Sequence, residues 1–177
     1  MRSNRPRLPV FFVALAALLA ACGGGGTTTS PEDSSASGSG SSAAPAAFTA
    51  ELLGGGELAS ASLAGNDAVL WFWAPWCTVC RAEADDVVAA ATALDGTVEV
   101  IGVAGRGEVP DMEDFVSDTE TGGLAHVIDD DGSIWSSYEV SAQPAYAFID
   151  DSGSVEVLVG ALGEQALVER MQALAEG

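Results

Sequence analysis

A run of six apolar residues that leads into a pair of cysteines constrains this chain more than any other feature. The run, AVLWFW at 68–73, carries β-branched and aromatic side chains and no polar position. Such a run is typical of a strand buried on both faces, as in parallel sheets covered by helices. After Cys77 the apolar residues follow helical spacing, at Cys80, Ala84, Val87, Ala91 and Leu94. We therefore expect a buried strand and then a helix, with the two cysteines at their junction.

The other apolar segments alternate between strand and helix patterns. Pro110 is expected to open an amphipathic helix, and the acidic turn at 150–153 is a hairpin signal. Strands are expected at 48–53, 57–58, 68–73, 98–103, 124–128, 145–149 and 155–159, and a last helix at 164–175. Alternation implies parallel strands, to which the hairpin adds an antiparallel edge. The sequence thus predicts one α/β domain over residues 48–177, with a mixed central sheet and helices on both faces.

The start of the chain differs in composition from this domain. Residues 1–9 hold three arginines and no acid, and an apolar run follows at 10–21. About a dozen apolar residues are too few to span a bilayer, which takes about 20, but they suit the core of a signal peptide. A soluble amphipathic helix is the alternative, although the run has no polar face. We expect residues 1–21 to be a signal peptide and the mature protein to be extracytoplasmic.

The sequence Leu19-Ala20-Ala21-Cys22 resembles the lipobox of bacterial lipoproteins, in which the cysteine becomes the acylated first residue of the mature chain. The alternative is a spare cysteine behind an ordinary signal. Residues 22–47 are rich in Gly, Ser, Ala and Thr and offer almost nothing to bury, so we expect a disordered tether with a reach of about 25–30 Å. The resemblance implies a lipid anchor at Cys22, on the outer face of the cytoplasmic membrane.

The charge of the chain excludes some partners. Removal of residues 1–21 leaves three arginines and no lysine against 26 acids. Nucleic acid and anionic lipid headgroups are poor partners for such a surface. The acidic run at 129–131 lacks the alternating spacing of a calcium loop and is expected to be a turn.

Three uses of Cys77 and Cys80 are open: a metal site, a structural bridge and a redox pair. A zinc site needs four protein ligands, or three and a water, and the sole histidine, His126, falls in an expected strand as an ordinary strand residue. A bridge across two residues closes a very small loop and adds little stability in the entropic account. The redox pair is therefore favoured, and no metal or other cofactor is expected.

The position of the cysteines supports redox chemistry. A sulfur at the start of a helix meets unpaired backbone N–H groups and the positive end of the helix dipole, which favour the thiolate. Cys80 lies one turn later, on the inward stripe. This asymmetry predicts an exposed attacking thiolate at Cys77 and a buried resolving thiol at Cys80. Trp76 and its neighbours would place an apolar surface around the sulfur, whereas Trp73 is expected to be a core residue.

The stretch WAPWCTVC at 73–80 resembles the active site of the thioredoxin superfamily, and the order of strands and helices fits that fold. Cys80-Arg-Ala-Glu83 further resembles the TlpA/DsbE-like branch, which implies that Glu83 assists proton transfer at the cysteines. The alternative is a solvated helix acid. Gln143-Pro144 resembles the cis-proline that faces the cysteine pair and binds substrate backbone. The resemblance thus implies a substrate surface that includes Pro75, Trp76, Gln143 and Pro144.

The resemblance covers the whole domain and points to secreted actinobacterial DsbE-like thiol-disulfide oxidoreductases. GVAG at 102–105, DGSIW at 131–135 and QPAYAFID at 143–150 share that pattern. There are departures. Trp71 stands where thioredoxins keep a buried Asp, Asp85 replaces a proline common in the TlpA branch, and Thr78-Val79 is neither Gly-Pro nor Pro-His. These departures concern the redox potential rather than the type of chemistry.

These features favour a membrane-tethered oxidant of extracytoplasmic proteins that contain cysteine pairs. A membrane redox partner would reset the cysteines. The alternative within the same class is a TlpA-like reductant for cytochrome c maturation. An alternative of another class is a non-catalytic thioredoxin-fold binding module whose cysteines stay bridged.

Overall fold

The computed structural model describes residues 47–177. The expected signal peptide at 1–21, Cys22 and nearly all of the expected tether at 22–47 lie outside the described residues. Within 47–177, no helix combines the length and the apolar character needed to cross a membrane.

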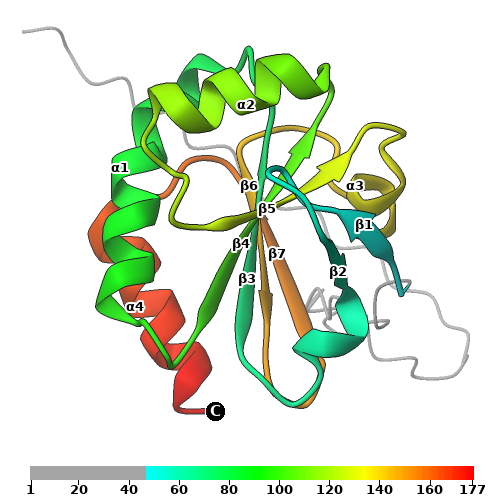
Figure 1. Cartoon of the computed structure of the whole chain (residues 1–177). Coiled ribbons are helices and arrows are strands. Elements are labelled where there is room, and N and C mark those ends of the chain that lie inside the picture. The colour runs from blue at the N-terminus through cyan, green and yellow to red at the C-terminus, as the bar shows by residue number, and fades with distance from the viewer. Residues whose placement is uncertain (1–46) are drawn as a thin grey trace, which may run out of the picture. The chain divides into compact units, whose positions relative to one another are not determined.

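A five-stranded sheet forms the centre of the domain (Figure 1). Its strand order is β5-β4-β3-β6-β7, with β3 parallel to β4, β4 parallel to β5, and β6 antiparallel to both β3 and β7. The strands are β3 (Ala68–Trp73), β4 (Glu99–Gly105), β5 (Ala125–Asp129), β6 (Ala145–Ile149) and β7 (Val155–Val159). The mixed central sheet expected from the sequence is confirmed.

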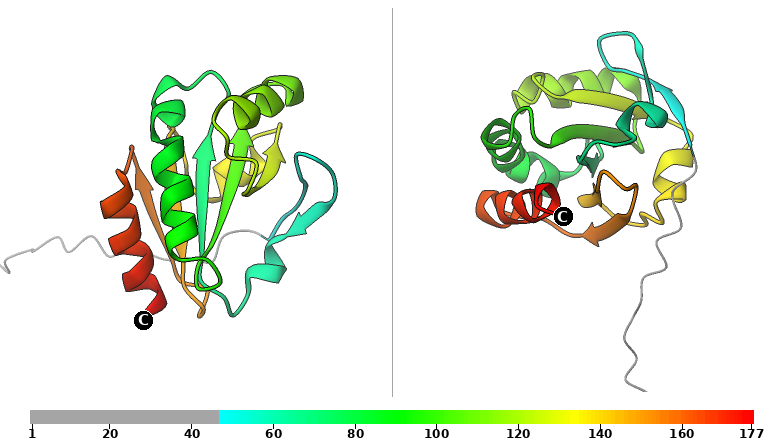
Figure 2. Two further views of the ribbon diagram at one scale, coloured as in Figure 1. Left: turned by 60° about the vertical axis from the view of Figure 1, so that its left-hand side comes forward. Right: turned by 90° about the horizontal axis from the view of Figure 1, so that it is seen from below.

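Helices and a small hairpin cover the sheet (Figure 2). The long helices are α1 (Thr78–Ala93), α2 (Val109–Asp118) and α4 (Glu164–Ala175). The shorter elements are β1 (Thr49–Glu51), β2 (Glu57–Ala59), the 3₁₀ helix η1 (Ser60–Leu63) and α3 (Ser133–Ser137). The short helices η1 and α3 are absent from the sequence-based expectation, which assigned no element to either segment.

The two faces of β3 bury two separate cores, because successive side chains of a strand point to opposite faces. On one face Val69, Trp71 and Trp73 pack with buried residues of α1, α2 and α4. On the other face Leu70 and Phe72 pack with residues of η1, α3 and the segment that follows α3. All six residues of β3 are fully buried, as the run AVLWFW predicts.

The topology brings three chain segments to one edge of the sheet. β3 and β4 are parallel, so their carboxyl ends lie at the same edge, and the antiparallel β6 begins there, with Ala145 opposite Phe72. The cysteines follow β3, Arg106 follows β4 and Pro144 precedes β6. This edge therefore collects segments that lie far apart in the sequence.

Candidate functional site

The cysteine pair lies at the first turn of α1. Cys77 is the N-cap residue of the helix, and its Sγ accepts a hydrogen bond from the backbone N–H of Cys80 at 3.1 Å. The two cysteines form a disulfide, with their Cα atoms 5.3 Å apart. The Cys77 sulfur therefore lies at the positive end of a 16-residue helix, where a negative charge is stabilised.

Cys80 is buried, as the sequence predicts, but Cys77 is more enclosed than expected. Cys77 is 5% exposed and Cys80 is fully buried. Cys77 is thus the more accessible of the two, but the expectation of an exposed residue is wrong. The side chain turns back over the first turn of the helix to accept the Cys80 amide, which takes it away from solvent.

The loop before Cys77 has one buried and one exposed member. Pro75 is buried, and a Cβ at Gly107 would clash with the Pro75 ring, so glycine is needed at that position. Trp76 is 60% exposed, and its indole N–H donates to the backbone carbonyl of Arg106 at 2.7 Å. Pro75 therefore supports the loop from within, while Trp76 provides apolar surface beside Cys77.

The loop before β6 lies at the same edge of the sheet. The Gln143–Pro144 peptide bond is cis, Pro144 is buried and Gln143 is half-buried. The amide oxygen of Gln143 accepts a hydrogen bond from the Arg106 guanidinium at 3.1 Å. Arg106 thus joins the cysteine loop, through Trp76, to the proline loop, a link that the sequence analysis did not identify.

Glu83 is a buried acid on the inward side of α1. It is 4% exposed, so the alternative of a solvated helix acid does not hold. Residues three apart on a helix are neighbours on its surface, which places Glu83 one turn from Cys80. The indole N–H of Trp71 donates to Glu83 Oε1 at 2.8 Å. Trp71, at the position where the sequence departs from thioredoxins, therefore contacts the acid directly.

The surroundings of Glu83 favour its neutral form. Burial raises the pKa of Glu83 to about 7, while the hydrogen bond from Trp71 acts in the opposite direction. Burial, and then the nearby Glu83 carboxylate, also raise the pKa of Tyr146. Glu83 Oε2 and the Tyr146 hydroxyl have no hydrogen-bond partner among the described residues. A carboxyl group that titrates near neutral pH beside a buried thiol is suited to giving and taking a proton.

Replacing Trp71 by Phe is expected to raise the pKa of Glu83 further. The change keeps an aromatic ring but removes the N–H donor that stabilises the ionised carboxylate, and a hydrogen bond of about 1 kcal/mol corresponds to somewhat less than one pH unit. Titration of the Glu83 carboxyl by NMR measures the shift. Trp73→Phe is the control, because the Trp73 indole donates to His126 instead. If the pKa of Glu83 is the same in Trp71→Phe and in the wild type, this hydrogen bond has no role in setting it.

His126 is a core residue of β5. It is 3% exposed, its Nδ1 accepts from the Trp73 indole at 3.3 Å, and its Nε2–H therefore donates to the Thr121 carbonyl at 3.0 Å. Burial lowers its pKa, which keeps the ring neutral. Trp73 is fully buried and stacks on Phe115, in agreement with the expected core position. Within 47–177, no group of three or more His, Cys, Asp or Glu residues is placed to hold a metal ion.

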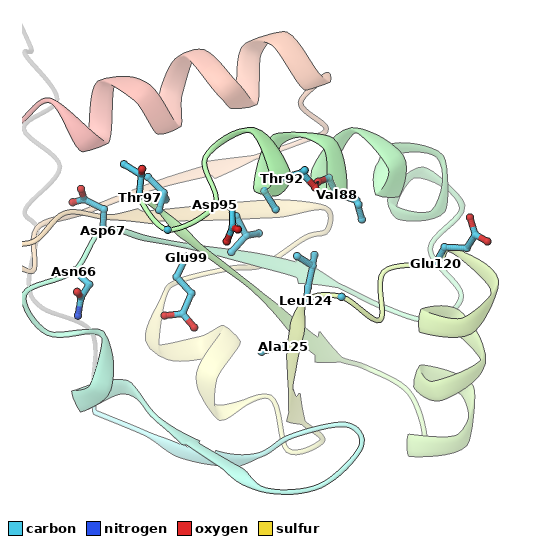
Figure 3. A pocket seen from close by; sticks show the side chains of 15 residues that line it. Asn66, Asp67, Val88, Thr92, Asp95, Thr97, Glu99, Glu120, Leu124 and Ala125 are labelled. Carbon is cyan, nitrogen blue, oxygen red and sulfur yellow. The ribbon is translucent and has the colours of Figure 1, made fainter.

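A cavity of the described domain lies away from the cysteines. It has a volume of about 650 Å³ and lies beside the last turns of α1 and the starts of β4 and β5 (Figure 3). Its carboxylates are Asp67, Asp95, Glu99 and Glu120. The cavity is lined by no cysteine and by none of Glu83, Trp71 and Tyr146. The cysteine pair lies at the opposite end of α1, so the cavity is not part of the thiol site.

Known proteins resemble the chain in sequence and in fold. Residues 41–158 match the AhpC/TSA family. The soluble secreted antigen MPT53 of Mycobacterium tuberculosis is 39% identical over 130 residues, which cover 72% of this chain and 74% of that protein. The relative from Mycobacterium bovis has the same identity and coverage.

Two solved structures are similar to the chain in both sequence and fold. The M. tuberculosis protein DsbF, in mixed oxidised and reduced forms, is 42% identical, with a TM-score of 0.69 over 72% of this chain and 94% of that chain. A secreted M. tuberculosis disulfide oxidoreductase homologous to E. coli DsbE is 38% identical, with a TM-score of 0.68 over 72% and 96% of the two chains. The chain therefore belongs to the AhpC/TSA family of the thioredoxin superfamily and is a thiol-disulfide oxidoreductase of the DsbE/DsbF type.

Proposed function

We propose that this protein is tethered by a lipid outside the cytoplasmic membrane and oxidises cysteine pairs of secreted proteins. The position of Cys77 Sγ at the start of α1 carries this proposal. The helix N-terminus stabilises the Cys77 thiolate, which exists only in the reduced protein. Stabilising the reduced form makes the disulfide easier to reduce, and the protein a better oxidant.

The exchange proceeds in two displacements. A client thiolate attacks Cys77 Sγ, the bond between Cys77 and Cys80 breaks, and Cys80 leaves as a thiolate. Because Cys80 is fully buried, its thiolate is unfavourable until it takes a proton, which Glu83 supplies. The second client thiolate then attacks the client sulfur in the mixed disulfide, and Cys77 leaves as a thiolate. Two electrons have passed from the client to the cysteine pair.

The residues around Cys77 provide the client surface in this proposal. Trp76 offers exposed apolar area beside the sulfur, and Gln143 and Pro144 lie at the same edge of the sheet. Pro75, which is buried, holds the loop in place. A membrane redox partner then accepts two electrons from the reduced pair and restores the disulfide. The similarity to MPT53, a soluble secreted antigen, supports an extracytoplasmic site of action.

A peptide with two reduced cysteines tests the activity. The purified full-length protein, in its disulfide form, is mixed with the dithiol peptide, and both products are separated by mass after acid quenching. The proposal predicts one peptide disulfide for each protein dithiol formed. Absence of exchange with any dithiol or disulfide peptide would contradict the proposal and favour a non-catalytic binding module.

Replacing Cys22 by Ala is expected to release the protein from the membrane. The change removes the proposed site of acylation, and the remaining chain has too little apolar surface at its start to stay anchored once the signal is cleaved. Fractionation of cells into membrane and soluble parts measures the shift, with peptide oxidation as the check that the released protein is intact. A wild-type protein found unacylated in the medium would contradict the lipid anchor.

A further inference from the structure

Arg106 holds together the two loops that border the cysteines. Its backbone carbonyl accepts the Trp76 indole N–H at 2.7 Å. Its guanidinium donates to the Gln143 side-chain oxygen at 3.1 Å and to the Ser141 carbonyl at 3.0 Å, and it lies 4.5 Å from the ring centre of Trp135. The guanidinium is therefore fixed in place although the residue is exposed.

The charge of Arg106 is not balanced by a carboxylate. Three arginines fall within 47–177. Arg81 pairs with Asp118 and Arg170 pairs with Glu156, each at 3.1 Å. Arg106 has no ion-pair partner among the described residues, although the chain carries 26 acids. Both of its hydrogen-bond acceptors are neutral oxygens, which leave a full positive charge beside the cysteine loop.

The guanidinium also keeps free hydrogen-bond donors. It has five N–H groups in a planar fork, and its two contacts occupy two of them. This fork fits the two oxygens of a carboxylate better than any neutral group. The chain carries 26 acidic residues, so its surface in general repels a client carboxylate. The unpaired charge of Arg106 attracts that carboxylate instead.

We propose that Arg106 selects client cysteines that have an Asp or Glu within two residues, by binding that carboxylate while the client sulfur is at Cys77. The inference rests on the proposed exchange reaction and names its substrate class. Trp76, adjacent to Cys77, donates its indole N–H to the Arg106 backbone carbonyl, which places Arg106 beside the cysteine loop. Two residues of extended client chain span about 7 Å, so an acidic side chain within two residues of the client cysteine lies over the loops that border Cys77, where Arg106 donates to Gln143 and Ser141.

A pair of dithiol peptides tests this preference. They differ only by Glu or Gln two residues from the first cysteine, and the ratio of their kcat/KM values for oxidation is measured with the full-length protein. The wild type is expected to prefer the Glu peptide about threefold to fivefold, as for an exposed ion pair, and the preference should decline in 0.5 M salt. Arg106→Gln should bring the ratio to one or below. Arg106→Glu should reverse it.

The ratio separates recognition from a purely structural role. If Arg106 only fixed the loops, Arg106→Gln would slow both peptides equally and leave their ratio unchanged, and the inference would be wrong. Arg170→Gln, which removes an arginine paired with Glu156, is the matched control and should keep the wild-type ratio. A wild-type preference that is absent or insensitive to salt would overturn the inference without any variant. Lack of exchange with both peptides would instead overturn the proposed function, and this inference with it.

Discussion

Replacing Cys80 by Ser is expected to stop turnover and to leave client proteins covalently attached to Cys77. In the proposed reaction Cys80 is the leaving group of the first displacement, and in the reverse direction its thiolate releases Cys77 from the mixed disulfide. Serine has nearly the same size, but it cannot form the disulfide with Cys77 that oxidises a client. When the Cys77 thiolate of the variant attacks a client disulfide, the serine hydroxyl cannot displace the client sulfur, so the reaction stops at the adduct. Non-reducing electrophoresis of cell extracts reveals these adducts, and peptide mapping identifies the attached cysteine.

The reciprocal variant is the control. Cys77→Ser keeps only the fully buried Cys80 and should form no adducts, because a client sulfur does not reach it. Adducts that map to Cys80 rather than to Cys77 would reverse the assignment of attacking and resolving thiols. Turnover that survives in Cys80→Ser would remove Cys80 from the reaction altogether.

Replacing Glu83 by Gln is expected to abolish a loss of about 3 kcal/mol in the free energy of unfolding that the wild type shows as the pH rises from 4.5 to 8. Glu83 has a pKa of about 7 in the folded protein and about 4.5 when unfolded. Between these values the folded protein keeps a proton that the unfolded chain releases, so the free energy of unfolding falls as the pH rises. The contribution of Glu83 is fully present below about pH 4.5 and is lost through pH 7. Gln does not titrate and should show no such loss.

Denaturant titrations of both disulfide-bonded proteins between pH 4.5 and 8 measure this difference. His126 is common to both proteins, so its contribution cancels. Asp85→Asn is the matched control, because it removes an exposed carboxylate from the same helix. A stability difference between wild type and Glu83→Gln that is constant with pH would contradict the raised pKa of Glu83, and with it the proposed proton transfer.

The sequence predicted the regular elements where local signals were strong. β6, β7 and α4 have the expected bounds, because an acidic turn with glycine separates the two strands and apolar residues follow helical spacing in the helix. α3 was missed because tertiary contacts rather than helix length stabilise it. The backbone N–H groups of Ile134 and Trp135, in its first turn, donate to the buried carboxylate of Asp129 in β5. The run of three acids at 129–131 does not indicate, from the sequence alone, that Asp129 accepts hydrogen bonds from the start of a helix.

The site was predictable in its chemistry but not in its contacts. Spacing and helix position identified Cys77 and Cys80 as the reactive pair, and the resemblance added Glu83. The hydrogen-bond donor to Glu83 is Trp71, twelve residues earlier in another element, so no local pattern reveals this contact. Arg106 was missed for the same reason, since its partners come from two distant loops.

The redox state of the cysteine pair in the cell tests the central claim most directly. Cells are quenched in acid, which stops thiol exchange, and the free thiols of Cys77 and Cys80 are then alkylated and counted by mass. An oxidant of client proteins must be stored as the disulfide, so we expect most of the protein to carry no alkylated thiol at this pair. A predominantly dithiol form would contradict the proposed function and indicate a reductant.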